Sequence, residues 1–285
     1  MSAPKSVLIT GCSDGGIGSA LARTFADRGF HVFATARDTS RASKLRDVSN
    51  VTLLTLDVTK QQDIDDAVAA VKMQTSGKLD VLVNNAGRNH FMPVLDEDVS
   101  KVKEVFEVNY WGPIKVTQAF APLLKDARGT LVFITSISGY VNTPFMGTYA
   151  ASKRSLEITA ETLRLELAPF GMPVMSIVTG AVQSQGQTYF GDWALPQNSL
   201  YKSIEDTIAA RARGRDALQR QDTMEYAGQV VDRIAEGKAG KYWCGGFADV
   251  VEGLTKGNTA QDVLDGIASM GTDLEKLGDG DAKGE

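Results

Sequence analysis

The stretch "ITGCSDGGIGSALA", residues 9–22, joins a short apolar run to a segment with helical periodicity. Its glycines, Gly11, Gly15, Gly16 and Gly18, fall within eight residues. Glycine lets a phosphate approach the backbone N–H groups at the start of a helix, where the helix dipole favours an anion. The spacing predicts a dinucleotide-binding turn, and a strand-to-helix turn that only needs positive φ is the alternative.

The pattern around this turn repeats along the chain to about residue 178. Nearly continuous apolar runs alternate with helical stretches, as in parallel strands covered on both faces. The sequence therefore predicts an α/β fold, a single doubly wound Rossmann-fold domain with a mainly parallel sheet flanked by helices. Predicted strands are 6–10, 31–36, 51–57, 79–84, 130–136 and 173–178, and predicted helices are 17–28, 40–47, 60–75, 98–125 and 149–168.

The remaining third of the chain has a more polar and irregular pattern. Helices are predicted near 202–218 and 222–236, and a last strand near 241–244. We expect one domain over residues 1–276, with a substrate lid at about 180–220. The tail 277–285 has no apolar periodicity, which predicts disorder.

Composition narrows the class of function. The chain has 285 residues and a formal net charge of -5, so no basic footprint for nucleic acid is expected. Its two cysteines and two histidines lack metal-ligand spacing, which predicts no metal site. No stretch reaches the roughly 20 apolar residues of a membrane span, and the start lacks the layout of a signal peptide. We expect a soluble, cytoplasmic protein, with peripheral lipid association left open.

Arg37 indicates which dinucleotide is bound. It follows the second predicted strand, where dinucleotide folds usually carry an acid for the ribose hydroxyls. A guanidinium instead pairs with a 2'-phosphate, so Arg37, helped by Ser13 and Arg41, predicts NADP(H). The alternative is a solvated strand-end arginine, with the neighbouring Asp38 as the acid.

Further cofactor contacts are predicted at the ends of later strands. Asp57 and Val58 follow the third strand, and "NNAG", with Asn85, Ala86 and Gly87, follows the fourth. Taken alone, the asparagines could simply form Asx turns. Together with the glycine turn they predict a cofactor cleft.

Tyr149 and Lys153 open the predicted helix 149–168 four residues apart. This spacing places the phenol and the ammonium on one helix face, where the cation is expected to lower the tyrosine pKa toward neutrality. Ser136 ends the fifth predicted strand. Asn109 lies mid-helix, where asparagine is disfavoured, and a helix break shared with Gly112 and Pro113 is its alternative.

These residues, in this order and spacing, resemble the short-chain dehydrogenase/reductase family over nearly the whole chain. The resemblance implies that Ser136 binds a substrate carbonyl and that Tyr149 protonates its oxygen as hydride arrives from the nicotinamide. Lys153 is implied to lower the Tyr149 pKa and to hold the nicotinamide ribose, and Asn109 to anchor a water. Phrases such as "FATAR" and "KYWCGG" are similar to the branch of fungal NADPH-dependent 1-acyldihydroxyacetone-phosphate reductases.

Two stretches depart from the family pattern. After the sixth strand, Thr179-Gly180-Ala181-Val182-Gln183-Ser184 replaces the usual Pro-Gly with a later threonine. Gly180, Val182 and Ser184 are still expected to bind the cofactor, because Ser184 keeps a hydroxyl. The C-terminal segment "ADVVEGLTKGNTAQDVLDGIASM" is more polar than in lipid-linked relatives, which favours a soluble ketone substrate. The cofactor turn itself is expected to use Gly11, Ser13, Gly16, Ile17 and Gly18.

The function predicted on these grounds is NADPH-dependent reduction of a small to medium apolar ketone. Alternatives are 1-acyldihydroxyacetone-phosphate reduction, with association to lipid droplets or endoplasmic reticulum, alcohol oxidation in the reverse direction, and a cofactor-binding scaffold. The resemblance implies a homodimer or homotetramer. Whether His90 and the lid aromatics Tyr189, Phe190 and Trp193 contact substrate stays open.

Overall fold

The computed structural model describes residues 4–216, 218–257 and 259–277, without the side chains of 187–189 and 261. The predicted tail therefore lies outside the described residues except for Leu277.

One parallel sheet forms the centre of the molecule, in the order β3-β2-β1-β4-β5-β6-β7. The predicted α/β doubly wound class is confirmed. The chain reverses its direction of winding between β1 and β4, and a crevice for ligands opens at such a point. The strands are β1 (Ser6–Ile9), β2 (His31–Ala36), β3 (Val51–Thr55), β4 (Val81–Asn84), β5 (Thr130–Ser136), β6 (Val174–Thr179) and β7 (Gly240–Cys244).

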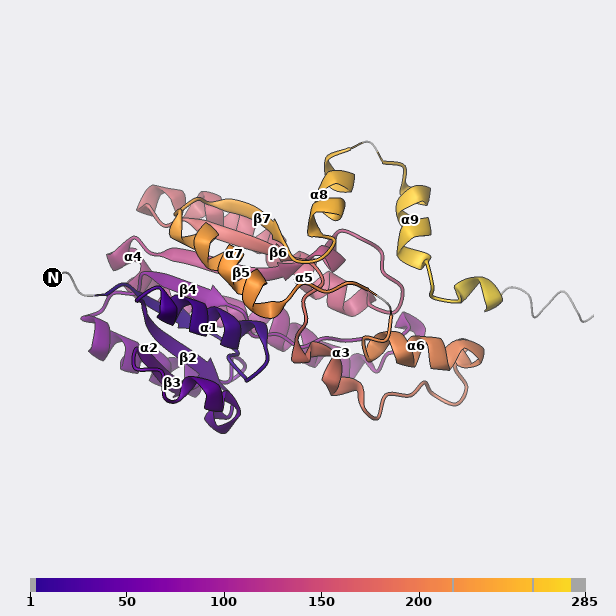
Figure 1. Cartoon of the computed structure of the whole chain (residues 1–285), viewed down its shortest axis with the longest axis horizontal. Coiled ribbons are helices and arrows are strands. Elements are labelled where there is room, and N and C mark those ends of the chain that lie inside the picture. The colour runs from indigo at the N-terminus through magenta and orange to yellow at the C-terminus, as the bar shows by residue number, and fades with distance from the viewer. Residues whose placement is uncertain (1–3, 217, 258, 278–285) are drawn as a thin grey trace, which may run out of the picture.

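Helices cover both faces of this sheet (Figure 1). α1 (Ile17–Asp27) and α7 (Thr223–Ala235) share one apolar core with one set of strand side chains. α2 (Gln61–Thr75), α4 (Gly112–Ala127) and α5 (Gly147–Glu166) share a second core with the opposite set. The alternation of strand side chains between the two cores accounts for the nearly continuous apolar runs in the sequence. The predicted helix 40–47 is a 3₁₀ helix, Thr39–Leu45.

The helix predicted at 98–125 is confirmed as a helical run over residues 99–127, but it is not one regular α-helix. The chain forms α3 (Val99–Phe106), a π-helical turn (Glu107–Trp111) and then α4. Gly112 packs so closely on Val58 that an added Cβ would lie 2.6 Å from a Val58 methyl carbon. Asn109 is buried in the π turn that directly precedes this contact, and such π bulges are often found at functional sites.

Residues 180–220, predicted to be a substrate lid and called the lid below, and the C-terminal segment, residues 248–277, extend beyond the end of the sheet (Figure 1). Of the helix predicted at 202–218, only α6 (Glu205–Ala212) is α-helical, preceded by a 3₁₀ turn at Lys202–Ile204. Two further helices, α8 (Ala248–Lys256) and α9 (Gln261–Ser269), were not predicted. A third apolar cluster joins lid and C-terminal segment; it includes Phe91, Phe145, Ile208, Phe190, Trp193, Leu274 and Leu277.

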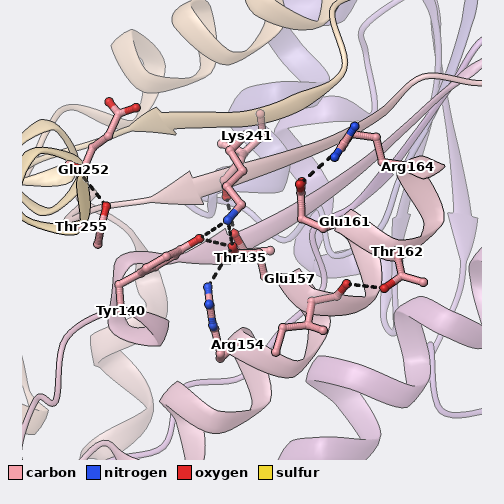
Figure 2. Close-up of polar contacts among 12 residues, drawn as sticks. Thr135, Tyr140, Arg154, Glu157, Glu161, Thr162, Arg164, Lys241, Glu252 and Thr255 are labelled. Atoms are coloured by element: carbon pink, nitrogen blue, oxygen red, sulfur yellow. Dashed lines mark hydrogen bonds and ion pairs between the residues drawn. The ribbon is translucent and has the colours of Figure 1, made fainter. Parts of the chain in front are cut away.

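A buried carboxylate fastens α5 to its surroundings. Glu157 is 1% exposed and accepts hydrogen bonds from Tyr140 and, at 3.1 Å, from Arg154. Lys241, from β7, lies 2.9 Å from the same Glu157 oxygen and donates to the Tyr140 hydroxyl at 2.8 Å. Figure 2 shows these groups converging on Glu157. The cluster links the loop after β5, helix α5 and the edge strand β7.

The same cluster shifts two ionisable groups. Burial and the hydrogen bond to Glu157 raise the pKa of Tyr140 above its ordinary 10.0. Burial alone would lower the pKa of Lys241, but its bonds to Tyr140 and Glu157 outweigh burial and raise the pKa above 10.5. Raised folded-state pKa values stabilise the protein below the unfolded values, and this stability is lost as the pH rises through the folded values.

We expect Glu157→Gln to lower the free energy of unfolding by about 1–3 kcal/mol, because charge-assisted bonds are lost. This loss of stability is smaller than for a fully buried ion pair, because Arg154 and Lys241 are partly exposed to water. Urea unfolding measures it. The matched control is Glu161→Gln on the same helix, whose partner Arg164 lies 3.3 Å away in a partly exposed pair, with a loss below about 1 kcal/mol.

The difference between wild type and Glu157→Gln should stay constant up to about pH 9 and shrink as the pH rises above about 10, where Tyr140 and Lys241 lose their protons. An equal loss in both glutamate variants, or a difference independent of pH, would contradict the role given to the cluster.

Candidate active site

A cavity of about 330 Å³ opens at the carboxyl ends of the central strands. Ser136, Tyr149 and Lys153 all line it, although they come from β5 and α5. Three of the four predicted catalytic residues thus meet in one place. The fourth, Asn109, lies directly behind the cavity wall.

Ser136 is the last residue of β5 and is 7% exposed. Its oxygen accepts a hydrogen bond from the Ser138 backbone N–H at 3.2 Å and so caps the short 3₁₀ turn Ile137–Gly139. This cap orients the hydroxyl at the strand end, where its proton is donated to the Ser138 hydroxyl at 3.2 Å and can be turned to a substrate oxygen instead.

Tyr149 and Lys153 stand one turn apart on α5, as predicted. The Lys153 ammonium donates to the Ile134 carbonyl oxygen at 2.9 Å, which fixes it against β5. Burial lowers the pKa of Lys153 to about 8. Burial also raises the pKa of Tyr149, and a hydrogen bond with Ser136 only partly offsets this rise.

The predicted lowering of the Tyr149 pKa by Lys153 is therefore wrong for this arrangement. Desolvation of the phenol outweighs its neighbours, and the lysine charge is directed to a backbone carbonyl. The phenol is neutral near pH 7, which suits a proton donor. The arrangement can thus protonate a substrate oxygen.

Asn109 lies in the π turn and is fully buried. Its oxygen accepts from the Arg88 backbone N–H at 2.8 Å, and its amide donates to the Arg88 carbonyl at 3.0 Å. The amide also donates to the Ser152 hydroxyl at 3.0 Å. Asn109 therefore ties the loop after β4 to α5, between Tyr149 and Lys153.

The glycine turn has the shape of a phosphate cradle. Gly15 has φ +72°, a conformation that side chains disfavour, and an added Cβ there would lie 2.9 Å from Gln185. A Cβ on Gly18 would collide with the Gly11 carbonyl and come within 2.5 Å of the Asn85 amide nitrogen. Gly16 begins α1 without a side-chain cap, which suits an anion at the helix start. A dinucleotide therefore fits these residues.

Asn85 holds this cradle in place. Its amide donates to the carbonyl oxygens of Thr10 at 2.8 Å and Gly11 at 3.0 Å. The Ala86 backbone N–H donates to the Thr10 hydroxyl at 2.9 Å. The "NNAG" segment thus braces the turn, and several predicted cofactor residues line the cavity: Ile17, Asn85, Gly87, Gly180, Val182 and Ser184.

Gly11, Ser13, Gly16 and Gly18 of the turn and Ala86 after β4 are not among the cavity lining, and three further predicted residues lie outside it at the ends of β2 and β3: Arg37, Asp57 and Val58. Arg37 is exposed after β2, and no ion pair to it exists among the residues described. Asp38, the competing acid, caps the 3₁₀ helix by accepting from the Ser40 N–H at 2.9 Å, and bonds to Ser40 lower its pKa. Asp57 accepts from Thr59. Val58 is buried against Gly112.

Four residues are sequence-based candidates for substrate contact at the cavity mouth: His90, Tyr189, Phe190 and Trp193. His90 lies 3.0 Å from Glu97 and is not among the cavity lining. Phe190 and Trp193 pack in the third apolar cluster, and the Trp193 indole donates to the Phe91 carbonyl at 2.5 Å. The side chain of Tyr189 lies outside the described residues.

Sequence reasoning missed the residues that form the outer walls of the cavity. They come from the loop after β5 and from the lid, where no periodic pattern signals a wall. They are Val141, Thr143, Met146, Arg211, Ala212, Asp216, Leu218 and Arg220.

Within the described residues no group of three or more His, Cys, Asp or Glu side chains could hold a metal ion. Nor does that part of the chain contain a helix long and apolar enough to cross a membrane.

Comparison with known proteins agrees with this geometry. The sequence model described as short chain dehydrogenase matches residues 5–194. "Short-chain dehydrogenase PC-15" of Penicillium crustosum is 47% identical over 86% of this chain and 89% of its own length. "NADPH-dependent 1-acyldihydroxyacetone phosphate reductase" of Schizosaccharomyces pombe is 43% identical over 79% of this chain and 76% of its own length.

Solved structures share the fold over most of the chain. A short-chain dehydrogenase from Streptomyces avermitilis is 29% identical with a TM-score of 0.77, covering 98% of this chain and 99% of its own. One from Burkholderia cenocepacia, in complex with NADP, is 24% identical with a TM-score of 0.72, covering 93% and 97%. The chain is therefore a member of the short-chain dehydrogenase/reductase family, an NAD(P)-dependent oxidoreductase acting on CH–OH or C=O groups.

Proposed function

We propose that the protein reduces the carbonyl group of a small to medium apolar ketone with NADPH. The observation that carries this proposal is the convergence of Ser136, Tyr149 and Lys153 in one cavity with apolar side chains on its walls. The bound cofactor supplies the hydride from its nicotinamide.

The residues of this chain supply the proton and the orientation. The neutral Tyr149 phenol donates its proton to the substrate oxygen, and the Ser136 hydroxyl donates a second hydrogen bond to it. Two placed donors stabilise the negative charge that develops on this oxygen. Lys153 holds the nicotinamide ribose, and Asn109 anchors a water of the proton relay.

The cofactor preference rests on charge at the end of β2. Arg37 has no carboxylate partner among the described residues, whereas Asp38 already serves as a helix cap. A free guanidinium at this position is suited to the 2'-phosphate of NADPH. Arg41 and Ser13 are the proposed helpers.

Two other activities use the same residues. Oxidation of a secondary alcohol is the reverse reaction and depends on the cofactor pool. Reduction of a 1-acyldihydroxyacetone phosphate is favoured by the Schizosaccharomyces pombe relative. Two assays separate these candidates. One measures NADPH oxidation with matched ketones, including the phosphate ester, and the other measures NADP⁺ reduction with secondary alcohols. Absence of turnover with every compound would favour a cofactor-binding scaffold without enzyme activity.

We also propose a cytoplasmic homodimer or homotetramer, with peripheral lipid association if the acyl phosphate ester is the substrate. Exposed apolar side chains on α5 and the adjoining π turn support assembly through these helices. They are Trp111, Ile158 and Leu165.

Tyr149→Phe should lower turnover by about 10²–10⁴-fold, the usual contribution of a general acid, while NADPH affinity persists. Steady-state assays and cofactor fluorescence measure the two quantities. Tyr110→Phe is the matched control, because Tyr110 is half-buried, bonds Thr159 and does not line the cavity. Retained turnover in Tyr149→Phe would sink the proposed role.

The pH profile should report Lys153. Because burial lowers its pKa to about 8, the ammonium is present below this pH and is lost above it. We expect kcat/KM to fall as the pH rises through about 8, and Lys153→Met to be slow at every pH. A wild-type profile that stays level to about pH 10 would argue against a required ammonium.

Arg37→Ala should weaken NADPH binding by about 1.5–3 kcal/mol, the range for hydrogen bonds to charged groups, and leave NADH binding nearly unchanged. Titration of cofactor fluorescence measures both. Arg46→Ala, also exposed and close in sequence, should affect neither. Equal losses for both cofactors would show that Arg37 does not touch the phosphate.

A further inference from the structure

Within the part of the chain that the structure describes, one cavity-lining arginine has no carboxylate to balance its charge. Arg88, Arg211 and Arg220 all line the cavity. Arg88 pairs with Glu104 at 3.0 Å, and Arg220 pairs with Asp216 at 2.7 Å. Among the described residues no carboxylate forms an ion pair with Arg211.

Arg211 is held in position by the C-terminal segment rather than by a counter-charge. It lies on α6, and one terminal nitrogen donates to the carbonyl oxygens of Met270 at 3.2 Å and Gly271 at 3.1 Å. These carbonyls follow the end of α9, and their partial negative charge offsets only part of a full positive charge.

The guanidinium keeps unused hydrogen-bonding capacity. Its Nε is buried and has no hydrogen-bond partner. The Nε is enclosed by protein, whereas the second terminal nitrogen makes no hydrogen bond among the described residues and is accessible, so its two N–H donors can meet a ligand oxygen.

The surroundings fix where this arginine sits. Thr207, one turn before Arg211 on α6, donates to Asp273 at 2.5 Å, and Leu274 packs in the third apolar cluster. The lid and the C-terminal segment thus place Arg211 on a different wall from Tyr149 of α5. Phe91, Val141, Met146, Ala212 and Leu218 supply the apolar lining of the same cavity.

We propose that Arg211 binds a carboxylate or phosphate group carried by the ketone substrate. A planar guanidinium with free donors is suited to such an anion, and the apolar lining suits the carbon chain that joins the anion to the reacting carbonyl. This inference rests on the proposed ketone reduction and narrows the substrate from an apolar ketone in general to one whose apolar chain ends in an anionic group.

The test compares straight-chain keto acids of varied ketone-to-carboxylate distance with their methyl esters. Arg211→Met should lower kcat/KM for the best keto acid by about 10- to 100-fold, as expected for lost charge-assisted bonds, and leave its ester within about twofold. The matched control is Arg213→Met. Arg213 also holds lid carbonyls, at 3.2 Å from Phe190 and 3.1 Å from Gly191, but it does not line the cavity.

The control should change acid and ester equally. Equal losses for acid and ester in Arg211→Met, or a wild type that prefers the esters, would overturn the inference while leaving ketone reduction intact. A weaker affinity for NADPH in Arg211→Met would assign the arginine to the cofactor phosphates and also overturn it.

Failure of the wild type on every ketone would overturn the proposed function instead. In that case, titration calorimetry with the enzyme and NADP⁺ tests whether Arg211 binds an anion. Decanoate binding that exceeds methyl decanoate binding and is lost in Arg211→Met, but not in Arg213→Met, supports the anion site. Absence of such a difference overturns it.

Discussion

The close contact of three backbone segments at the start of the chain governs the rest of the structure. Gly18 of α1 lies on the Gly11 carbonyl, and the Asn85 amide bonds that carbonyl from the end of β4. A side chain at residue 18 would force α1 away from β1. The crevice, the phosphate cradle and the approach of β4 all require that this space stay empty.

Helix α5 then carries the chemistry to this crevice. Tyr149, Lys153 and Glu157 follow one another at four-residue intervals and lie on the buried side of the helix. Lys153 attaches to β5 and Glu157 to Lys241 of β7, so two successive turns are fixed to the sheet. The position of the phenol is set by these attachments more than by its own contacts.

The pattern of apolar residues predicted those strands and helices that local sequence determines. The strands before residue 180 were placed within two residues, because burial on both faces leaves a continuous apolar run. The π turn at Asn109 was missed, since apolar periodicity does not distinguish a π turn from regular α-helix, and the neighbouring contact of Gly112 with Val58 comes from a distant strand end. The Tyr149 pKa was predicted in the wrong direction, because spacing reveals the neighbouring cation but not the depth of burial. Arg211 could not be predicted as a cavity residue, because the Gly271 carbonyl oxygen that positions it lies 60 residues further along the chain.

The third apolar cluster separates the part of the protein that forms the substrate wall from the part that binds the cofactor. Lid and C-terminal segment pack on each other around Ile208 and Leu274, apart from the two cores that hold the sheet. We expect substitutions there to alter the shape and charge of the substrate wall more than the cofactor half, because the cluster shares no residue with the two sheet cores. Substitutions in this cluster are therefore expected to change substrate preference, while the strands, the phosphate cradle and the proton donor Tyr149 keep their structure.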